Sequence, residues 1–221
     1  YTESVYFNII LIILKIFMYS KMSVSKQFIL DNCDTGDILL YNSRTIVGRI
    51  IEYCTYSKFS HVVMILKNPI HIDPSLTGLY IIESGKENIP DVISGKKILG
   101  VQIIPLEKAL EYFDNAYVGN LYYRKLNCER NTEFNNKVTN VIKKVEGSPY
   151  DLNVIDWVKA RFDIEIGDCH KTNTFWCSAL VSYLYVKMGL LDPDLSWSLI
   201  PPKKFSYYEN DRLTFQNCSL E

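Results

Sequence analysis

Three side chains in this sequence have the chemistry needed for nucleophilic catalysis: the thiol of Cys177, the imidazole of His61 and the carboxylate of Glu83. Cys177 opens the apolar segment CSALVSYLYVKM, residues 177–188, whose pattern predicts a largely buried helix ended by Gly189. At a helix N-terminus the dipole and the unpaired N–H groups favour a thiolate over a thiol and can hold an oxyanion. A buried structural cysteine would fit this segment equally well.

His61 and Glu83 belong to two short apolar segments that we expect to pair as a hairpin. Residues 60–66 (SHVVMIL) and 79–83 (LYIIE) both have the composition of buried strands. Pairing would bring the carboxylate beside the imidazole, where it fixes the tautomer and leaves the second ring nitrogen for the thiol. Taken singly, each is more often an ordinary polar residue at a strand end. His170, close to Cys177 in sequence, is the rival candidate for the base.

The sequence lacks the motifs of several other catalytic and binding chemistries. The chain has no GxxxxGK[ST], GxGxxG, HExxH or GxSxG motif, so nucleotide-loop, zincin and serine-hydrolase functions lose their usual signals. Cys169, His170 and Cys177 match no common zinc spacing, and no CxxC pair occurs, so we expect neither a metal nor a cofactor. With 24 basic and 25 acidic side chains the net charge is -1, so no nucleic-acid partner is expected.

The elements that must position these residues form an α+β pattern. Of the 221 residues 48% are hydrophobic and 22% charged, which is typical of a globular chain. We expect one domain over residues 31–221, an antiparallel sheet packed against helices that include the nucleophile helix. Besides the segments above, strands are predicted at 38–41, 101–104 and 117–126, and helices at 45–53, 105–113, 131–146 and 153–162.

Residues 1–22 precede this domain and contain an apolar run, residues 5–19, interrupted by Asn8 and Lys15. The run is shorter than a typical membrane-spanning helix and lacks the flanks of a signal peptide, so we interpret it as an anchor or a packing helix. The six scattered cysteines indicate mostly reduced thiols, since a chain of this size needs no disulfide framework. We therefore expect a cytoplasmic or membrane-associated protein.

Several segments in order carry a family resemblance. They are Gly36-Asp37-Ile38-Leu39, residues 56–62 (YSKFSHV), Ile81-Ile82-Glu83-Ser84, and residues 147–152 (GSPYDL) leading to residues 176–181 (WCSALV). Together they resemble the circularly permuted branch of the NlpC/P60 papain-like cysteine hydrolases, which includes YiiX-like bacterial proteins and related poxvirus proteins. The order, with His before Cys and a GxPYD-like segment between, separates this branch from papain-like enzymes in which Cys comes first.

The resemblance implies a permuted papain-like fold and a role for each matched residue. Cys177 would be the nucleophile, His61 the base and Glu83 the group that orients the base, while Tyr150 would lie near the oxyanion or the substrate. Asp37 and Asp151 match positions that support turns near the site. The implied activity is cleavage of an amide or (thio)ester through a covalent acyl-enzyme, with a peptide, amide-linked or acyl-lipid substrate.

Two alternatives stay open from the residues alone. One is acyl transfer by an enzyme of the same superfamily, since only the acceptor differs. The other is a papain-like shell that acts as a binding or structural subunit, using the apolar N-terminal segment and an aromatic segment at 205–208 (FSYY) expected to be exposed. The chain is also rich in Ile, Asn, Lys and Tyr, which is typical of AT-rich viral or protist genomes, so we assign no cell-wall substrate.

Overall fold

The structure is a computed structural model that describes residues 25–43, 59–86, 88–151, 170, 172–207 and 213–221. The predicted helices at 45–53 and 153–162 and the apolar segment at 1–22 lie outside the described residues. The described helices and strands are α2 (Lys26–Asn32), β1 (Ile38–Ser43), β2 (His61–Lys67), β3 (Leu79–Gly85), β4 (Gly100–Pro105), α4 (Leu106–Ala116), β5 (Tyr117–Arg124), β6 (Leu126–Asn127), α5 (Thr132–Val145), α7 (Cys177–Met188), the 3-10 turns η1 (Trp197–Leu199) and η2 (Pro202–Phe205), and β7 (Ser219–Leu220).

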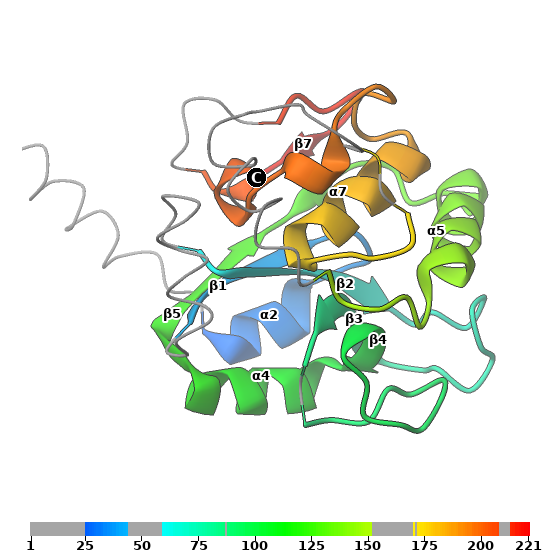
Figure 1. Ribbon diagram of the computed structural model, residues 1–221. Coiled ribbons are helices and arrows are strands. Elements are labelled where there is room, and N and C mark those ends of the chain that lie inside the picture. The colour runs from blue at the N-terminus through cyan, green and yellow to red at the C-terminus, as the bar shows by residue number, and fades with distance from the viewer. Residues whose placement is uncertain (1–24, 44–58, 87, 152–169, 171, 208–212) are drawn as a thin grey trace, which may run out of the picture.

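A five-stranded antiparallel sheet in the order β4-β3-β2-β1-β5 forms the centre of the fold. Helices α2 and α4 lie on one face of this sheet, and α7 with α5 covers the other (Figure 1). The predicted α+β class with an antiparallel sheet is therefore confirmed. Because both faces are covered, the strand β2 is apolar at nearly every position instead of alternating with polar residues.

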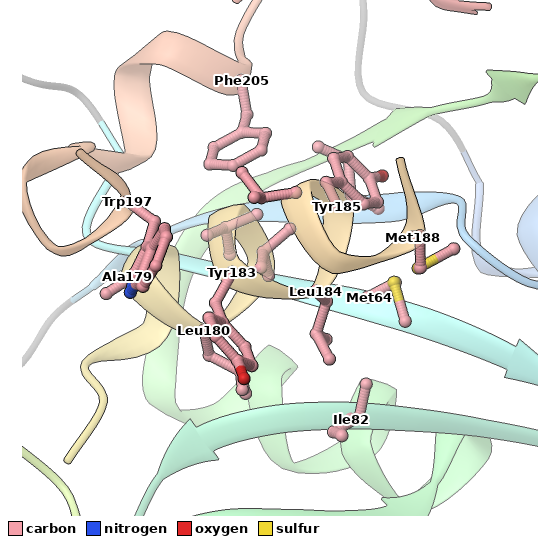
Figure 2. Packing of buried hydrophobic residues seen from close by; sticks show 14 of the residues in the cluster. Met64, Ile82, Ala179, Leu180, Tyr183, Leu184, Tyr185, Met188, Trp197 and Phe205 are labelled. Carbon is pink, nitrogen blue, oxygen red and sulfur yellow. The ribbon is translucent and has the colours of Figure 1, made fainter. Parts of the chain in front are cut away.

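Alternate side chains of each strand enter two separate hydrophobic clusters. Met64 of β2 packs in the cluster under α7, whereas its neighbour Val63 packs in the cluster under α2 and α4. Figure 2 shows Leu180 and Leu184 of α7 directed towards Met64 and Ile82 of the sheet. Every residue of α7 except Lys187 is buried, which explains why this helix has no polar face. Burying one such leucine contributes about 1.5–3 kcal/mol.

Most predicted elements are confirmed within one to three residues, but three features differ. The strand expected at 117–126 divides into β5 and β6, because Lys125 exchanges two main-chain hydrogen bonds with Glu221 and β6 then pairs with β7 instead of β1. Helix α2 was not predicted; its Ile29 is completely buried and Ser25 caps its N-terminus. The expectation of an exposed aromatic segment at 205–208 was wrong for Phe205, which is buried in the main core.

Gly100 allows β4 to approach the segment that precedes Tyr150. At its φ of 149° a side chain is disfavoured, and a Cβ atom there would lie 2.2 Å from the carbonyl oxygen of Ser148. Val101 N donates to that oxygen at 2.8 Å, and Tyr150 N donates to Leu99 O at 3.3 Å. The edge of the sheet thereby holds the 148–150 segment close to the strands that carry the candidate site.

Candidate active site

His61 and Glu83 form a buried pair on neighbouring strands. The imidazole Nε2 of His61 lies 2.7 Å from Glu83 Oε2, and the two residues are 6% and 0% exposed. The strands β2 and β3 pair antiparallel in a register that puts both side chains on the sheet face covered by α4. The ring of Phe113, from α4, packs edge-on to the imidazole with centroids 6.0 Å apart. The predicted hairpin therefore does bring the imidazole and the carboxylate together.

Gln102 is a third member of this polar group, and the sequence reasoning missed it. It lies directly opposite Glu83 in the β3–β4 register, and its Nε2 donates to Glu83 Oε1 at 3.1 Å. Both side chains are fully buried. A buried carboxylate is costly unless its oxygens are hydrogen-bonded, and here one oxygen accepts from Gln102 while the other contacts His61. The signal in the sequence was a lone amide inside an apolar strand (GVQIIP).

Cys177 is the first residue of α7 and is 1% exposed. Its Sγ donates a weak hydrogen bond, 3.7 Å long, to the carbonyl oxygen of Ser60. The N-cap residue Trp176 provides no side-chain cap, so the N–H groups of the first turn have no capping side chain. Ser178 Oγ donates to Ile200 O at 2.6 Å, which fixes the start of α7 against the 198–200 turn.

The Cys177 thiol contacts the main chain at the start of β2, next to His61, but is not hydrogen-bonded to the imidazole itself. Cys177 contacts the carbonyl of Ser60, the residue immediately before His61. However, α7 covers one face of the sheet while the imidazole of His61 lies on the other, beside Phe113. Among the contacts of the described residues there is no thiol–imidazole hydrogen bond. His61 thus contacts Glu83 directly, whereas Cys177 contacts Ser60, the residue before His61.

The 149–151 segment pairs with the residues that lead into α7. Phe175 N donates to Pro149 O at 3.1 Å and Asp151 N donates to Phe175 O at 3.0 Å, so Tyr150 bridges to Phe175. Ser84, next to Glu83 on β3, donates its hydroxyl to the same Phe175 carbonyl at 2.6 Å. The half-buried Tyr150 and Asp151 therefore lie beside the residues that lead into Cys177.

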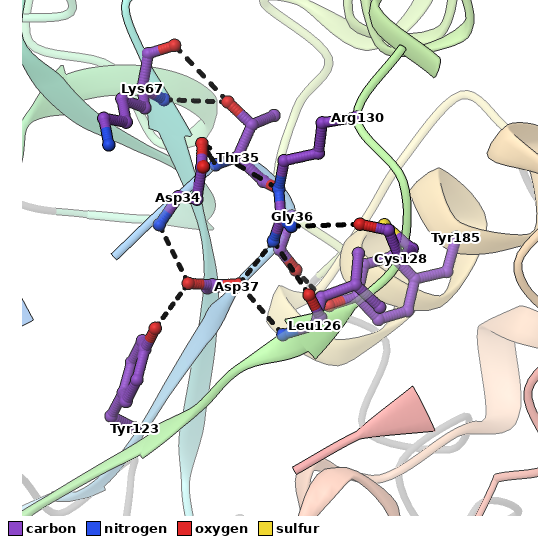
Figure 3. Close-up of polar contacts among 10 residues, drawn as sticks. All are labelled: Asp34, Thr35, Gly36, Asp37, Lys67, Tyr123, Leu126, Cys128, Arg130 and Tyr185. Carbon is purple, nitrogen blue, oxygen red and sulfur yellow. Dashed lines mark hydrogen bonds and ion pairs between the residues drawn. The ribbon is translucent and has the colours of Figure 1, made fainter. Parts of the chain in front are cut away.

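Asp37 occupies a different place, at the turn between α2 and β1 (Figure 3). Its buried carboxylate accepts hydrogen bonds from Tyr123 Oη at 2.5 Å, Leu126 N at 2.9 Å and Arg130 Nη2 at 2.8 Å, and also from the main chain of Asp34. Burial raises the pKa of Asp37 above its usual value, although these hydrogen bonds by themselves lower it. The carboxylate joins the start of the sheet to the strand β5 and the segment before α5.

The rival base, His170, lies at the surface and packs against an aromatic side chain. His170 is exposed, and its ring packs edge-on to Trp197 with centroids 4.4 Å apart. Cys169 lies outside the described residues. Within the described part of the chain no group of three or more His, Cys, Asp or Glu side chains is arranged to hold a metal ion. None of the helices in this part of the chain has the length and apolar character to span a membrane.

Comparison with known proteins adds a structural likeness. No family model matches the chain. No curated protein matches it either. Among solved structures, the crystal structure of metalloprotein YiiX from Escherichia coli O157:H7 aligns with a TM-score of 0.48 and 19% identity, covering 85% of this chain and 96% of that one. The function is therefore inferred from the geometry of the site and from the order of the sequence segments.

Proposed function

We propose that this protein is a papain-like cysteine hydrolase of the circularly permuted NlpC/P60 type, with Cys177 as nucleophile, His61 as base and Glu83 as the group that orients the base. The observation that carries the proposal is the buried His61–Glu83 pair. The Cys177 thiol contacts the carbonyl of Ser60, the residue next to His61. The order of the matched sequence segments, which resembles that of the family, supports it independently.

In the proposed reaction His61 keeps a proton on Nε2 and donates it in a hydrogen bond to the Glu83 carboxylate, while Nδ1 takes the proton of the Cys177 thiol. The thiolate attacks the carbonyl carbon of an amide, ester or thioester, and the N–H groups of the first turn of α7 hold the oxyanion. His61 then gives its proton to the leaving group, and water hydrolyses the acyl-enzyme. Because α7 covers one face of the sheet and the imidazole lies on the other, this step requires a rearrangement at the start of β2 that brings Nδ1 to Sγ when substrate binds.

Roles for the remaining matched residues follow from their positions. We assign Tyr150 to the substrate side of the site, because its segment pairs with Phe175 just before the nucleophile. Asp151 and Asp37 are assigned structural support. The substrate class stays an amide-linked, peptide or acyl-lipid molecule. The absence of a nucleic-acid partner, and a cytoplasmic or membrane-associated location, stay predictions from the sequence.

A second candidate is a papain-like shell that binds partners without chemistry. The burial of all three proposed catalytic side chains and the lack of a thiol–imidazole hydrogen bond favour it. One experiment separates the two functions: reaction of the whole chain with the small activated ester p-nitrophenyl acetate, with each acetylated cysteine identified by peptide mass spectrometry.

Cys33 is the internal control for this experiment, because it is also 1% exposed and free, and burial raises its pKa to about 11. An active hydrolase acetylates Cys177 at least about 10-fold faster than Cys33 at neutral pH, and loses that advantage in His61→Ala but not in His71→Ala. Subsequent loss of the acetyl group to water shows hydrolysis. Equal rates at the two cysteines, or a Cys177 rate that His61→Ala leaves unchanged, would make the shell the better description.

A further inference from the structure

Two cysteines outside the candidate active site flank the small sheet formed by β6 and β7: Cys128 directly follows β6 and Cys218 directly precedes β7. The antiparallel register pairs Leu126 with Leu220 and Asn127 with Ser219. Continuing this register by one step beyond the two strands would place Cys128 opposite Cys218. Both are free thiols of intermediate exposure.

The hydrogen-bond pattern gives this pair the closer of the two antiparallel spacings. Lys125 and Glu221 exchange both main-chain hydrogen bonds, each 2.8 Å long, so they form a hydrogen-bonded pair. Pairs alternate along an antiparallel ladder, which makes the positions of Cys128 and Cys218 a non-hydrogen-bonded pair with Cα atoms roughly 4.5 Å apart. That separation falls within the range of about 4.4–6.8 Å that a disulfide spans.

Both thiols also point to the same side of the ladder. Leu126 is fully buried and Leu220 half-buried, whereas the intervening Asn127 and Ser219 are exposed. Side chains two residues along a strand share a face, so Cys128 and Cys218 lie on the inner face, and both pack against the main core. Burial raises the pKa of both thiols, and the nearby Cys218 raises the pKa of Cys128 further, as expected at short range.

We propose that Cys128 and Cys218 form a reversible disulfide that fastens the C-terminal strand β7 to β6. In the reduced chain the Cys218 thiol donates to Gln216 O at 2.9 Å, so bond formation breaks this hydrogen bond and turns the side chain towards Cys128. Besides the β6–β7 ladder, the Arg124 guanidinium donates to Leu220 O, so the crosslink would add a covalent bond to these polar contacts of the C-terminal segment.

The oxidant is a small-molecule disulfide. The Cys128 thiolate attacks one of its sulfur atoms, forms a mixed disulfide and releases one thiol. The Cys218 thiolate then attacks the Cys128 sulfur and releases the second thiol. Two protein thiols and one disulfide thus give one protein disulfide and two small thiols, so electrons and protons balance.

The test equilibrates the full chain with oxidised and reduced glutathione at about pH 8, blocks the remaining thiols, and maps the crosslinks by mass spectrometry without reduction. We expect a peptide pair joined through Cys128 and Cys218. Because the crosslink closes a long loop, the Tm of the oxidised chain should rise by about 5–10 °C over the reduced chain.

Both effects should disappear in Cys218→Ser and persist in Cys33→Ser, which removes a buried cysteine from the opposite side of the main sheet. Stable glutathione adducts on Cys128 and Cys218 without the crosslink would overturn the proposal. An equal rise in Tm for the wild type and Cys218→Ser would overturn it as well, since the stabilisation would then come from another pair.

Discussion

At the scale of single residues, the environment of Glu83 determines which nitrogen of His61 can carry a proton. A carboxylate accepts hydrogen bonds only, so His61 Nε2, 2.7 Å away, must be the protonated nitrogen when the ring is neutral. Gln102 completes the arrangement by donating to the other carboxylate oxygen. The neutral Nδ1 is thereby prepared to accept a proton, which is the state that the proposed mechanism needs.

Glu83→Gln tests this directly, because the new amide would accept from Gln102 and donate to His61 Nε2. The ring proton would then move to Nδ1, the nitrogen proposed to serve as base. We expect acetylation of Cys177 by p-nitrophenyl acetate to slow by about 100-fold or more, with the fold retained. Glu107→Gln, the same change at an exposed position of α4, should leave the rate unaltered. An unchanged rate in Glu83→Gln would remove Glu83 from the mechanism.

At the scale of elements, the Asp37 carboxylate holds together segments that are distant in sequence. Arg130, from the segment before α5, gives one hydrogen bond to Asp37 Oδ1 and another to the carbonyl of Thr35 in the same turn. The hydroxyl of Tyr185, in α7, donates to Gly36 O. The turn between α2 and β1 thus contacts the helix that carries Cys177, which is how a residue remote from the thiol can support the site.

Asp37→Asn should therefore destabilise the protein, because an amide has one acceptor oxygen where the carboxylate serves several donors. We expect the free energy of unfolding in urea to fall by about 3–5 kcal/mol, the usual cost of breaking a buried charged pair. Asp34→Asn is the matched control: its side chain is 40% exposed and 3.8 Å from Arg130, so it should cost less than about 1 kcal/mol. Similar losses in both variants would show that Asp37 has no special supporting role.

At the scale of the whole molecule, burial on both faces of the sheet also sets how stability depends on alkaline pH. Cys33 lies in the cluster under α2 and α4, where burial and the nearby Asp37 raise its pKa from 9.0 to about 11. Between these pH values the unfolded chain loses this proton while the folded chain keeps it. The free energy of unfolding should consequently fall as pH rises from about 9 to about 11.

Urea unfolding of the wild type and Cys33→Ala at several alkaline pH values measures this contribution. Other alkaline groups titrate in both proteins, so the difference in slope isolates Cys33. We expect the wild type to lose stability more steeply, by up to about 1.4 kcal/mol per pH unit. Identical slopes would mean that the thiol titrates alike in the folded and unfolded chains.

The sequence by itself determined the local elements and one contact of the candidate site. The apolar runs at 60–66 and 79–83 predicted two neighbouring strands, and the contact of His61 with Glu83 follows from their pairing. The helix that starts at Cys177 and stops at Gly189 was also readable, because apolar patterning and a C-terminal glycine are local signals.

Only the tertiary structure decided which groups meet across the sheet and between its layers. Gln102 contacts Glu83 because the β3–β4 register pairs the two residues. Asp37 accepts a hydrogen bond from Arg130, which is far from it in sequence. The structure also placed Cys177 beside Ser60 instead of in a hydrogen bond with His61. A strand pattern shows that a residue is buried but not which face it occupies when both faces are apolar, so these contacts depend on packing that no local pattern encodes.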